Sequence, residues 1–377
     1  MYIYISFIYC LIYLFQDVFH RHIYLFMFVF IYLISAKTAS YVKRHVHTCL
    51  YTVYVTRVRG TPHSWRLVKL LAVSSVLVLT AQFLVSTRTQ HPAKPDGLTV
   101  QRGGALSPHT YHYTLDQPAV CRHRRPFLVF MVPVAPQEAA AREAVRTTWG
   151  APGQDTLTLF FTGLPEGPRV SSIQDKLEDE SGTHADIVQM NFRDSYQNLT
   201  IKTVLMMNWV ATHCPNATYV MKVDADIFVN VFHLLGWLRS APRRGFITGS
   251  VISDGRPRRD NSSKWYVSEE QFPEDRFPRY VSGAGYVLSA DLAGRISWAS
   301  RFVRMISMED VYVGLCLRVL GVRPVYSFSL LPPRNLFEIR DLAYDRCAFA
   351  KLIIVNGFKP SKLLHAWRDF SKDHGSC

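Results

Sequence analysis

Residues 219–230 read YVMKVDADIFVN, and this segment indicates both the architecture and the chemistry. Its first part, Tyr219–Val223, is a short apolar run typical of a buried strand. Asp224 and Asp226 follow at once, so two carboxylates are expected at the carboxyl end of that strand. Mg²⁺ or Mn²⁺ is commonly held by one or two carboxylates together with substrate phosphates. The alternative is a solvated loop without a metal; an EF-hand is excluded because Phe228 stands where a third ligand would be needed.

Short apolar runs alternate with helical patterns on both sides of this segment. Strands are expected at 127–134, 157–162 and 187–190, and helices at 137–149 and 199–213. This alternation predicts an α/β domain with a mostly parallel central sheet, in which ligands bind at the carboxyl ends of the strands. The globular domain is expected to begin near Pro126 and to occupy residues 126–377.

A transmembrane anchor is expected at residues 70–87, which are 18 consecutive residues without a charge. That length is close to the roughly 20 residues that a membrane-spanning helix needs. Lys and Arg are frequent just before the segment and sparse just after it, so the positive-inside rule places the N-terminus in the cytoplasm and the rest of the chain in the lumen. No small-residue cleavage site follows, which favours an uncleaved signal anchor.

The charge distribution supports a membrane topology over nucleic-acid binding. The 377-residue chain has a formal charge of +14, but residues 1–130 hold 14 Lys and Arg against 3 Asp and Glu, which leaves only +3 for the remainder. A nucleic-acid partner is therefore not expected. Residues 88–125 lack periodicity and are interpreted as a stem. Residues 1–69 are an N-terminal extension, whose apolar beginning is either a membrane-associated hairpin or an addition of doubtful expression.

Cysteines and sequons both agree with an oxidising, secretory compartment. Five of the seven cysteines follow the expected anchor without CxxC spacing, which excludes zinc-ribbon and thioredoxin-type motifs. Disulfides are expected among them, and an odd number leaves at least one thiol free or intermolecular; the pairing cannot be deduced from sequence. Three N-x-[ST] sequons, at Asn198, Asn216 and Asn261, all lie on the expected lumenal side.

Two arginines precede the acidic segment on a predicted helix. Arg142 and Arg146 are four residues apart, so they share one helix face and are candidates to clamp a diphosphate through charge-assisted hydrogen bonds. The alternative is an exposed basic face. Trp149, just beyond, is expected to pack in the core.

A second pair of acids, Glu309 and Asp310, precedes the apolar run 311–320. They are expected to open a helix, where the helix dipole favours negative charge, so a purely capping role is one interpretation. The other is a general base, because a carboxylate can accept the proton of a substrate hydroxyl that lies within hydrogen-bond reach.

Small and aromatic residues supply further candidates. Gly283 and Gly285 lie in a strand-like run, where the absence of a side chain lets a ligand or another backbone come close, although a bulge without function fits the pattern equally. The run Lys264, Trp265 and Tyr266 offers an aromatic platform for a sugar face, with a buried Trp as the alternative.

Five motifs, in order, resemble the β-1,3-galactosyltransferase and β-1,3-N-acetylglucosaminyltransferase family. Together they span roughly residues 126–377, and an ordered set is far more specific than any single motif. The motifs are REAVRTTW at 142–149, DIVQ at 186–189 with DSYQNLTIKT at 194–203, KVDADIFVN at 222–230, YVSGAGYVLS at 280–289 and EDVYVG at 309–314. NWVAT at 208–212 and KWY at 264–266 resemble the galactosyltransferase branch most.

The resemblance implies a GT-A fold, a UDP-sugar donor such as UDP-galactose, Mn²⁺ or Mg²⁺, and an inverting mechanism. It implies that Asp310 is the base and that Asp224 and Asp226 hold the metal. Donor binding would involve these two aspartates together with Arg142, Arg146, Gly283 and Gly285.

One position departs from the family pattern. Where its members usually carry a His that looks like a further metal ligand, this chain has Asn356. An amide oxygen can coordinate a cation, with less bias toward softer transition metals.

The function expected from sequence is that of a single-pass type II Golgi membrane enzyme. It would transfer galactose from UDP-galactose, in β-1,3 linkage, to an acceptor sugar such as N-acetylglucosamine on a glycoprotein or glycolipid. Two alternatives remain open at this stage: transfer of N-acetylglucosamine instead of galactose, and a membrane-tethered sugar-binding protein without turnover.

Overall fold

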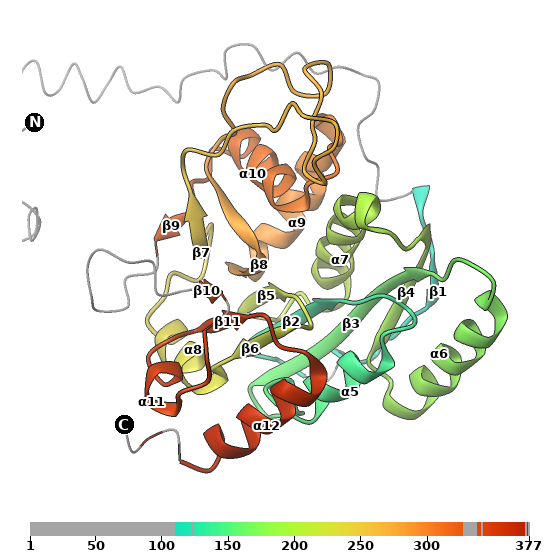
Figure 1. The fold of residues 1–377 in the computed structure, drawn as a ribbon, viewed down its shortest axis with the longest axis vertical. Coiled ribbons are helices and arrows are strands. Elements are labelled where there is room, and N and C mark those ends of the chain that lie inside the picture. The colour runs from blue at the N-terminus through green and yellow to red at the C-terminus, as the bar shows by residue number, and fades with distance from the viewer. Residues whose placement is uncertain (1–109, 123, 327–337, 341, 374, 376–377) are drawn as a thin grey trace, which may run out of the picture. The chain divides into compact units, whose positions relative to one another are not determined.

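An eight-stranded mixed sheet lies at the centre of the computed structural model, which describes residues 110–122, 124–326, 338–340, 342–373 and 375 (Figure 1). The strands follow the order β1-β4-β3-β2-β5-β8-β7-β9. Their bounds are β1 Tyr113–Leu115, β2 Leu128–Pro133, β3 Thr156–Leu164, β4 Ile187–Arg193, β5 Tyr219–Val223, β7 Ile247–Ile252, β8 Tyr280–Ser289 and β9 Val325–Tyr326. A smaller sheet has the order β10-β11-β6, with β6 Ile227–Val229, β10 Glu338–Arg340 and β11 Ile354–Asn356.

Helices connect the strands and cover the large sheet. They are α5 Ala139–Arg146, α6 Val170–His184, α7 Leu199–His213, α8 Val231–Leu238, α9 Ala290–Ala299, α10 Glu309–Val319, α11 Arg346–Phe349 and α12 Pro360–Phe370. Two short 3-10 helices are η2 Tyr196–Asn198 and η3 Ser300–Phe302.

The middle of the large sheet is parallel, as the alternation of strands and helices predicts. Strands β4, β3, β2 and β5 pair in parallel, whereas β8 runs antiparallel to both β5 and β7. The chain therefore has a mixed α/β architecture in which the carboxyl ends of four parallel strands meet along one edge. The D-x-D segment leaves the sheet at this edge.

Alternate residues of each strand enter two separate hydrophobic cores, because successive side chains point to opposite faces of a sheet. In β2, Val129 and Met131 pack with helices α7, α9 and α10, whereas Phe130 and Val132 pack with α5, α8 and α12. Both faces are covered, which explains why the parallel strands read as continuous apolar runs.

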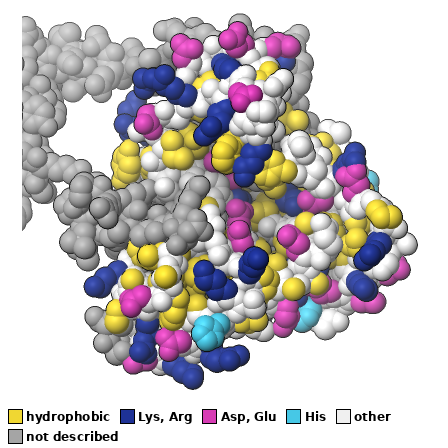
Figure 2. Space-filling view, viewed as in Figure 1, with side chains coloured by type: hydrophobic (Ala, Val, Ile, Leu, Met, Phe, Trp, Pro, Cys, Tyr) yellow, Lys and Arg dark blue, Asp and Glu magenta, His cyan; other side chains and the backbone are white. Residues whose placement is uncertain are grey.

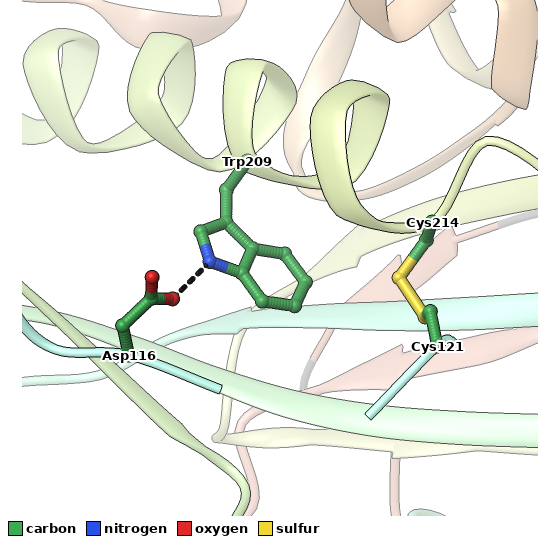
Figure 3. Close-up of a disulfide and its surroundings, with 4 residues drawn as sticks. All are labelled: Asp116, Cys121, Trp209 and Cys214. Atoms are coloured by element: carbon green, nitrogen blue, oxygen red, sulfur yellow. Dashed lines mark hydrogen bonds between the residues drawn. A yellow bond between two sulfur atoms is a disulfide. The ribbon is translucent and has the colours of Figure 1, made fainter. Parts of the chain in front are cut away.

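The folded domain begins earlier than the boundary at Pro126 predicted from sequence. Strand β1 pairs antiparallel with β4, and Asp116, directly after β1, accepts a hydrogen bond of 2.6 Å from the indole nitrogen of Trp209 in α7 (Figure 3). A disulfide between Cys121 and Cys214 fastens the same segment to the end of α7. Part of the expected stem is therefore the edge strand of the large sheet. The strand is short and its surroundings are polar, so the sequence there has no periodicity that would predict it.

The expected disulfides are confirmed at Cys121 and Cys214, and Cys316 is a buried free thiol. The expected anchor at 70–87 lies outside the described residues. Within them, no helix combines the length and the apolar character needed to cross a membrane.

Candidate active site

The two aspartates of the D-x-D segment lie at the carboxyl end of β5, as predicted. Backbone contacts hold them there: the Asp224 amide donates to the Ala284 carbonyl of β8 at 3.1 Å, and the Asp226 carbonyl accepts from the Phe358 amide at 2.8 Å. The segment is therefore fixed on one side to the large sheet and on the other to the chain after β11.

Lys222, one residue before the end of β5, links the first aspartate to the second acidic pair. Its side chain is only 4% exposed. The ammonium lies 2.6 Å from Asp224 Oδ1 and 3.1 Å from Glu309 Oε1, and it also donates to the Gly283 carbonyl. Asp224 and Glu309 raise the pKa of Lys222 despite its burial, so the side chain stays cationic. One buried positive charge thus joins β5, β8 and α10.

Asp310 and Glu309 form the first turn of α10, as predicted for this pair. Asp310 Oδ1 accepts from the Val311 amide at 2.8 Å and its Oδ2 from the Gly283 amide at 3.2 Å. Glu309 is buried and accepts from the Tyr286 hydroxyl at 3.3 Å. Asp310 does more than open its helix, because one of its oxygens is tied to β8.

The two glycines of β8 make room for different neighbouring side chains. A Cβ on Gly283 would lie 2.7 Å from Glu309 Oε1, so the absence of a side chain makes room for the acidic turn of α10. A Cβ on Gly285 would lie 2.9 Å from Cδ1 of Ile354 in β11. The close approaches expected at both positions are therefore made by other parts of this chain.

Asn356 is brought next to the D-x-D segment by strand pairing. It is the last residue of β11, and its register partner in β6 is Ile227, the residue after Asp226. A position some 130 residues further along the chain than the aspartates thus reaches the same end of the sheet.

Negative charge is concentrated where these elements meet. Burial and the charge of Asp224 raise the pKa of Asp226; burial also raises that of Asp310. Burial raises the pKa of Glu309 to about 7, against the opposing effect of Lys222. Figure 2 shows acidic side chains in a hollow of the surface, with basic and hydrophobic side chains along its upper margin.

The residues present fit a hard divalent cation. Asp226 has no side-chain hydrogen-bond donor among the described residues, and burial together with the charge of Asp224 raises its pKa. Two carboxylates and a nearby amide are the oxygen donors that Mg²⁺ and Mn²⁺ accept. Across the described part of the chain, no cluster of three or more His, Cys, Asp and Glu residues could hold a metal ion. A cation here would therefore need further ligands from a substrate or solvent.

The structure does not bring the two arginines into this acidic cluster. Arg142 is buried and donates to Glu180 at 2.8 and 2.6 Å, and also to the carbonyls of Ala135 and Pro136. Arg146 pairs with the same Glu180 at 2.7 Å and with Asp186 at 2.8 Å. The two arginines share one helix face, as predicted. That face is not an exposed basic surface, and both guanidinium groups are already paired with carboxylates. Arg142 thus supports the loop that follows β2, whereas Arg146 ties α5 to α6 and to the residue before β4.

One buried ion pair was not predicted from sequence, although both of its members lie in the motif at 194–203. Lys202 of α7 is buried, and its ammonium lies 2.9 Å from Asp194 Oδ1 and 3.2 Å from the Val134 carbonyl. Asp194 also accepts from the Gly163 amide at 2.7 Å. This ion pair ties together the ends of β2, β3 and β4, so it shapes the edge at which the aspartates lie.

The aromatic candidates have different environments. Trp149 is buried as predicted, and its indole nitrogen donates to the Ile227 carbonyl at 2.8 Å. Trp265 and Tyr266 are 39% and 37% exposed, which rules out the buried alternative for this pair.

Comparison with known proteins places the chain in a family. Residues 140–327 match the model of the galactosyltransferase family. Over 280 residues the chain is 39% identical to β-1,3-galactosyltransferase 1 of Mus musculus, covering 72% of this chain and 82% of that protein. The chain belongs to the galactosyltransferase family. All the site residues described above except Asn356 lie within the region matched by the galactosyltransferase model.

Further comparisons agree. The chain is 37% identical to β-1,3-galactosyltransferase 2 of Mus musculus over 303 residues, covering 77% of this chain and 70% of that protein. The human β-1,3-galactosyltransferase 2 is 36% identical with the same coverage. Among solved structures, the galactosyltransferase LgtC in complex with donor and acceptor sugar analogues is 10% identical, with a TM-score of 0.32 over 66% of this chain and 95% of that one. We draw nothing from a likeness this weak.

Proposed function

We propose that this galactosyltransferase family member transfers galactose from UDP-galactose to a sugar hydroxyl in β-1,3 linkage, with inversion, on a GT-A fold. Membership of the family and relatives named β-1,3-galactosyltransferase support the reaction. One structural observation carries the assignment of residues. The Gly283 amide donates to Asp310 and its carbonyl accepts from Lys222, which pairs with Asp224, so the proposed base and the D-x-D segment are joined through Gly283 and Lys222.

The proposed chemistry is a single displacement. The acceptor oxygen attacks the anomeric carbon of galactose, the bond from that carbon to the diphosphate oxygen breaks, and UDP leaves with the electron pair. Asp310 takes the proton of the acceptor hydroxyl. Two backbone amides fix the direction of its carboxylate, and burial raises its pKa, which makes the carboxylate a stronger base.

We assign Asp224 and Asp226 to metal binding, with the Asn356 amide oxygen beside them. When bound, Mn²⁺ or Mg²⁺ would offset the negative charge of the diphosphate. Lys222 holds Asp224 in place and Gly283 keeps the turn of α10 close to it. We assign structural roles to Arg142, which supports the loop after β2, and to Arg146, which ties α5 to α6, because Glu180 and Asp186 occupy their guanidinium groups.

We place the enzyme in the Golgi membrane, with a single type II anchor at 70–87 and the catalytic domain in the lumen. The uncharged 18-residue segment and the disulfide at Cys121 and Cys214 support this location. An acceptor such as N-acetylglucosamine on a glycoprotein or glycolipid fits the reaction.

A second candidate is a sugar-binding protein without turnover. Asn356 favours it, because an amide replaces the His usual at this position and the described residues hold only two carboxylates for a metal. Transfer of N-acetylglucosamine remains the alternative for the donor.

Replacement of Asp310 by Asn tests the assignment. Asn keeps the shape but can accept from only one of the two backbone amides that donate to Asp310, and it cannot take a proton, so transfer should fall by roughly 10²–10⁴ while UDP affinity persists and the melting temperature falls slightly. A capping role predicts little change, since Asn is as good a cap as Asp. A stable Asp310→Asn protein with near-normal transfer would remove Asp310 from the mechanism.

A further inference from the structure

The C-terminal part of the domain carries an excess of positive charge. Residues 342–373 contain 6 Lys and Arg against 3 Asp and no Glu, a net charge of +3 that equals the net charge of all of residues 131–377. The rest of residues 131–377 therefore balances to zero. Figure 2 shows Lys, Arg and His side chains gathered at the lower edge of the molecule, where Figure 1 places α12.

These charges lie along the outward face of α12. Lys362, His365, Arg368 and Lys372 are all exposed and follow one another at intervals of three or four residues, so they share one side of the helix. The first and the last are 10 residues apart, which corresponds to about 15 Å along a helix. The cationic face is therefore elongated.

The acidic residues of the same segment do not neutralise this face. The Asp369 carboxylate accepts from the Tyr344 hydroxyl at 2.7 Å and lies 3.8 Å from the Arg346 guanidinium, and Asp373 lies 3.6 Å from the same guanidinium. Both carboxylates are thus directed toward α11. Across the described residues, no ion pair joins the three cations of the outward face to any carboxylate.

Exposed apolar side chains border the cations. Leu364 of α12 is 38% exposed and Phe232 of α8 is 41% exposed. The Phe232 ring is stacked on Trp367 of α12, with a centroid distance of 6.0 Å and an interplanar angle of 7°. A flat apolar surface held by stacking therefore lies beside a row of hydrogen-bond donors.

We propose that the outward face of α12 and its apolar border bind an acidic glycan, a sugar chain that carries sulfate or carboxylate groups. Guanidinium and ammonium groups bind such anions through charge-assisted hydrogen bonds, and the C–H face of a sugar ring packs on apolar and aromatic side chains. We call this region the α12 surface; its residues are Lys362, Arg368, Lys372, Leu364 and Phe232.

The choice among polyanions rests on the proposed lumenal location. Anionic lipids are concentrated in the cytoplasmic leaflet of membranes, and a nucleic-acid partner is not expected for this chain. A flexible, elongated glycan fits both the row of charges and the apolar border. The inference goes beyond the proposed reaction, because it adds a glycan contact outside the acidic cluster.

The test is acetylation of lysines in the full-length protein, solubilised in detergent, with and without a heparin oligosaccharide as the acidic glycan. The reaction is followed at each lysine by mass spectrometry, because residues 1–130 hold 14 Lys and Arg and would bind a polyanion by themselves. Saturating heparin should slow acetylation of Lys362 and Lys372 about fivefold or more. Lys176, exposed in α6, should react at an unchanged rate. At about 0.5 M NaCl the protection should disappear, since charges are then screened over a few Å.

Two substitutions test the two halves of the α12 surface. Arg368→Gln should raise the heparin concentration needed to protect Lys362 and Lys372 by roughly fivefold, as expected for one cation near an anionic partner, and Leu364→Gln should raise it by a smaller factor. Arg169→Gln is the matched control, because Arg169 is an exposed arginine before α6; it should change nothing. Melting temperatures check that each variant is folded. If Arg368→Gln does not fold, Lys372→Gln takes its place.

Several outcomes would overturn the inference. Acetylation of Lys362 and Lys372 at the same rate with and without heparin is one, and equal protection of Lys176 is another. Poly-glutamate that protects at concentrations no higher than heparin would show general attraction of anions. Protection by phosphatidylserine vesicles but not by heparin would identify a membrane contact, and protection that grows with protein concentration alone would identify a second copy of the chain.

Failure of this inference is distinguishable from failure of the proposed function. The acetylation rates do not depend on turnover, so a wild-type protein that transfers no galactose contradicts the function and leaves this test unaffected. Conversely, an active enzyme whose α12 lysines are not protected by heparin contradicts only the α12 surface.

Discussion

Lys222 is the residue on which the arrangement of the acidic groups depends. Four carboxyl groups (Asp224, Asp226, Glu309 and Asp310) lie near one sheet edge, and a positive charge among them is stabilising because ionised carboxylates repel in a region of low dielectric. The buried ammonium pairs with both Asp224 and Glu309, whereas Asp226 forms no ion pair among the described residues and Lys222 acts on it only from a longer distance. The excess negative charge is therefore on the side of the cluster that faces the proposed metal.

Removal of either D-x-D carboxylate should abolish transfer without unfolding the domain. Asp226→Ala is the cleaner variant, since no side-chain donor among the described residues loses a partner. EDTA should have the same effect on the wild type, because the diphosphate charge would be left uncompensated. Transfer assays and melting temperatures check this, with the exposed Asp179→Ala in α6 as the control. Undiminished transfer by Asp226→Ala would refute the metal assignment.

The acidic cluster should make stability depend on pH in an unusual direction. The pKa values of Asp226, Asp310 and Glu309 are raised, that of Glu309 from 4.5 to about 7. The folded state then binds more protons than the unfolded state in this window, so the free energy of unfolding contributed by these groups falls as pH rises through it. Mn²⁺, which binds ionised carboxylates, should raise the melting temperature more at about pH 7.5 than at about pH 5.

Thermal unfolding across this range, with and without Mn²⁺, checks that prediction. Glu309→Gln removes the carboxyl whose pKa is raised to about 7 and should flatten the metal-free profile between about pH 5 and 7. A profile identical to that of the wild type would show that Glu309 is ionised at all these pH values.

Sequence reasoning identified the chemistry-bearing residues of this cluster better than their partners. Asp224, Asp226 and Asp310 stand at the ends of elements with clear periodicity, so their positions were predictable, whereas their roles come from the family resemblance and stay proposals. The partners of Arg142 and Arg146 were not predictable. Glu180 belongs to a helix 38 residues further along the chain than Arg142, and no local pattern shows which face of that helix points toward the arginines. Lys222 looked like an ordinary member of a strand.

At the scale of elements, the site depends on the close approach of α10 to β8. Gly283 and Gly314 make this possible: a Cβ on Gly283 would meet Glu309 Oε1 at 2.7 Å, and a Cβ on Gly314 would meet Tyr280 Cβ at 2.6 Å. The helix can therefore begin directly against the strand, which brings Asp310 within hydrogen-bond distance of the Gly283 amide.

Gly283→Ala should lower transfer by displacing the first turn of α10. Overpacking of this kind costs about 1–3 kcal/mol of stability, and the shift of Asp310 should lower kcat more than it changes the KM for UDP-galactose. Gly182→Ala in α6 is the control, because nothing lies within 4 Å of its added Cβ and Ala has the higher helix propensity. Normal kcat in Gly283→Ala, with Gly182→Ala also normal, would mean that the position of α10 is not critical.

The elements themselves were predictable where they are long and apolar. Strand β5 and helix α7 have the expected bounds, whereas the polar α6 was not anticipated because few of its residues are buried. Strand β1 has three residues and owes its place to β4, the disulfide and the bond from Trp209 to Asp116. Such long-range contacts have no signature in the local sequence.

At the scale of the whole molecule, the account requires the described domain to be lumenal. Asn216 and Asn261 are exposed, so N-glycans at these sequons would be compatible with the fold. Expression in cells should give a protein whose mobility increases on deglycosylation, and Asn216→Gln with Asn261→Gln should reduce that change. If no sequon is modified and protease digests the C-terminus from the cytoplasmic side of sealed microsomes, the proposed topology is wrong.

The most direct test of the central claim is the identity of the sugar that is transferred. Full-length protein with Mn²⁺ and an N-acetylglucosamine acceptor is offered UDP-galactose and UDP-N-acetylglucosamine separately, and the linkage of any product is determined by NMR. The account predicts transfer from UDP-galactose, a β-1,3 linkage in the product, and loss of activity with EDTA. Transfer from UDP-N-acetylglucosamine alone, or consumption of neither donor over a panel of glycan acceptors, would contradict it.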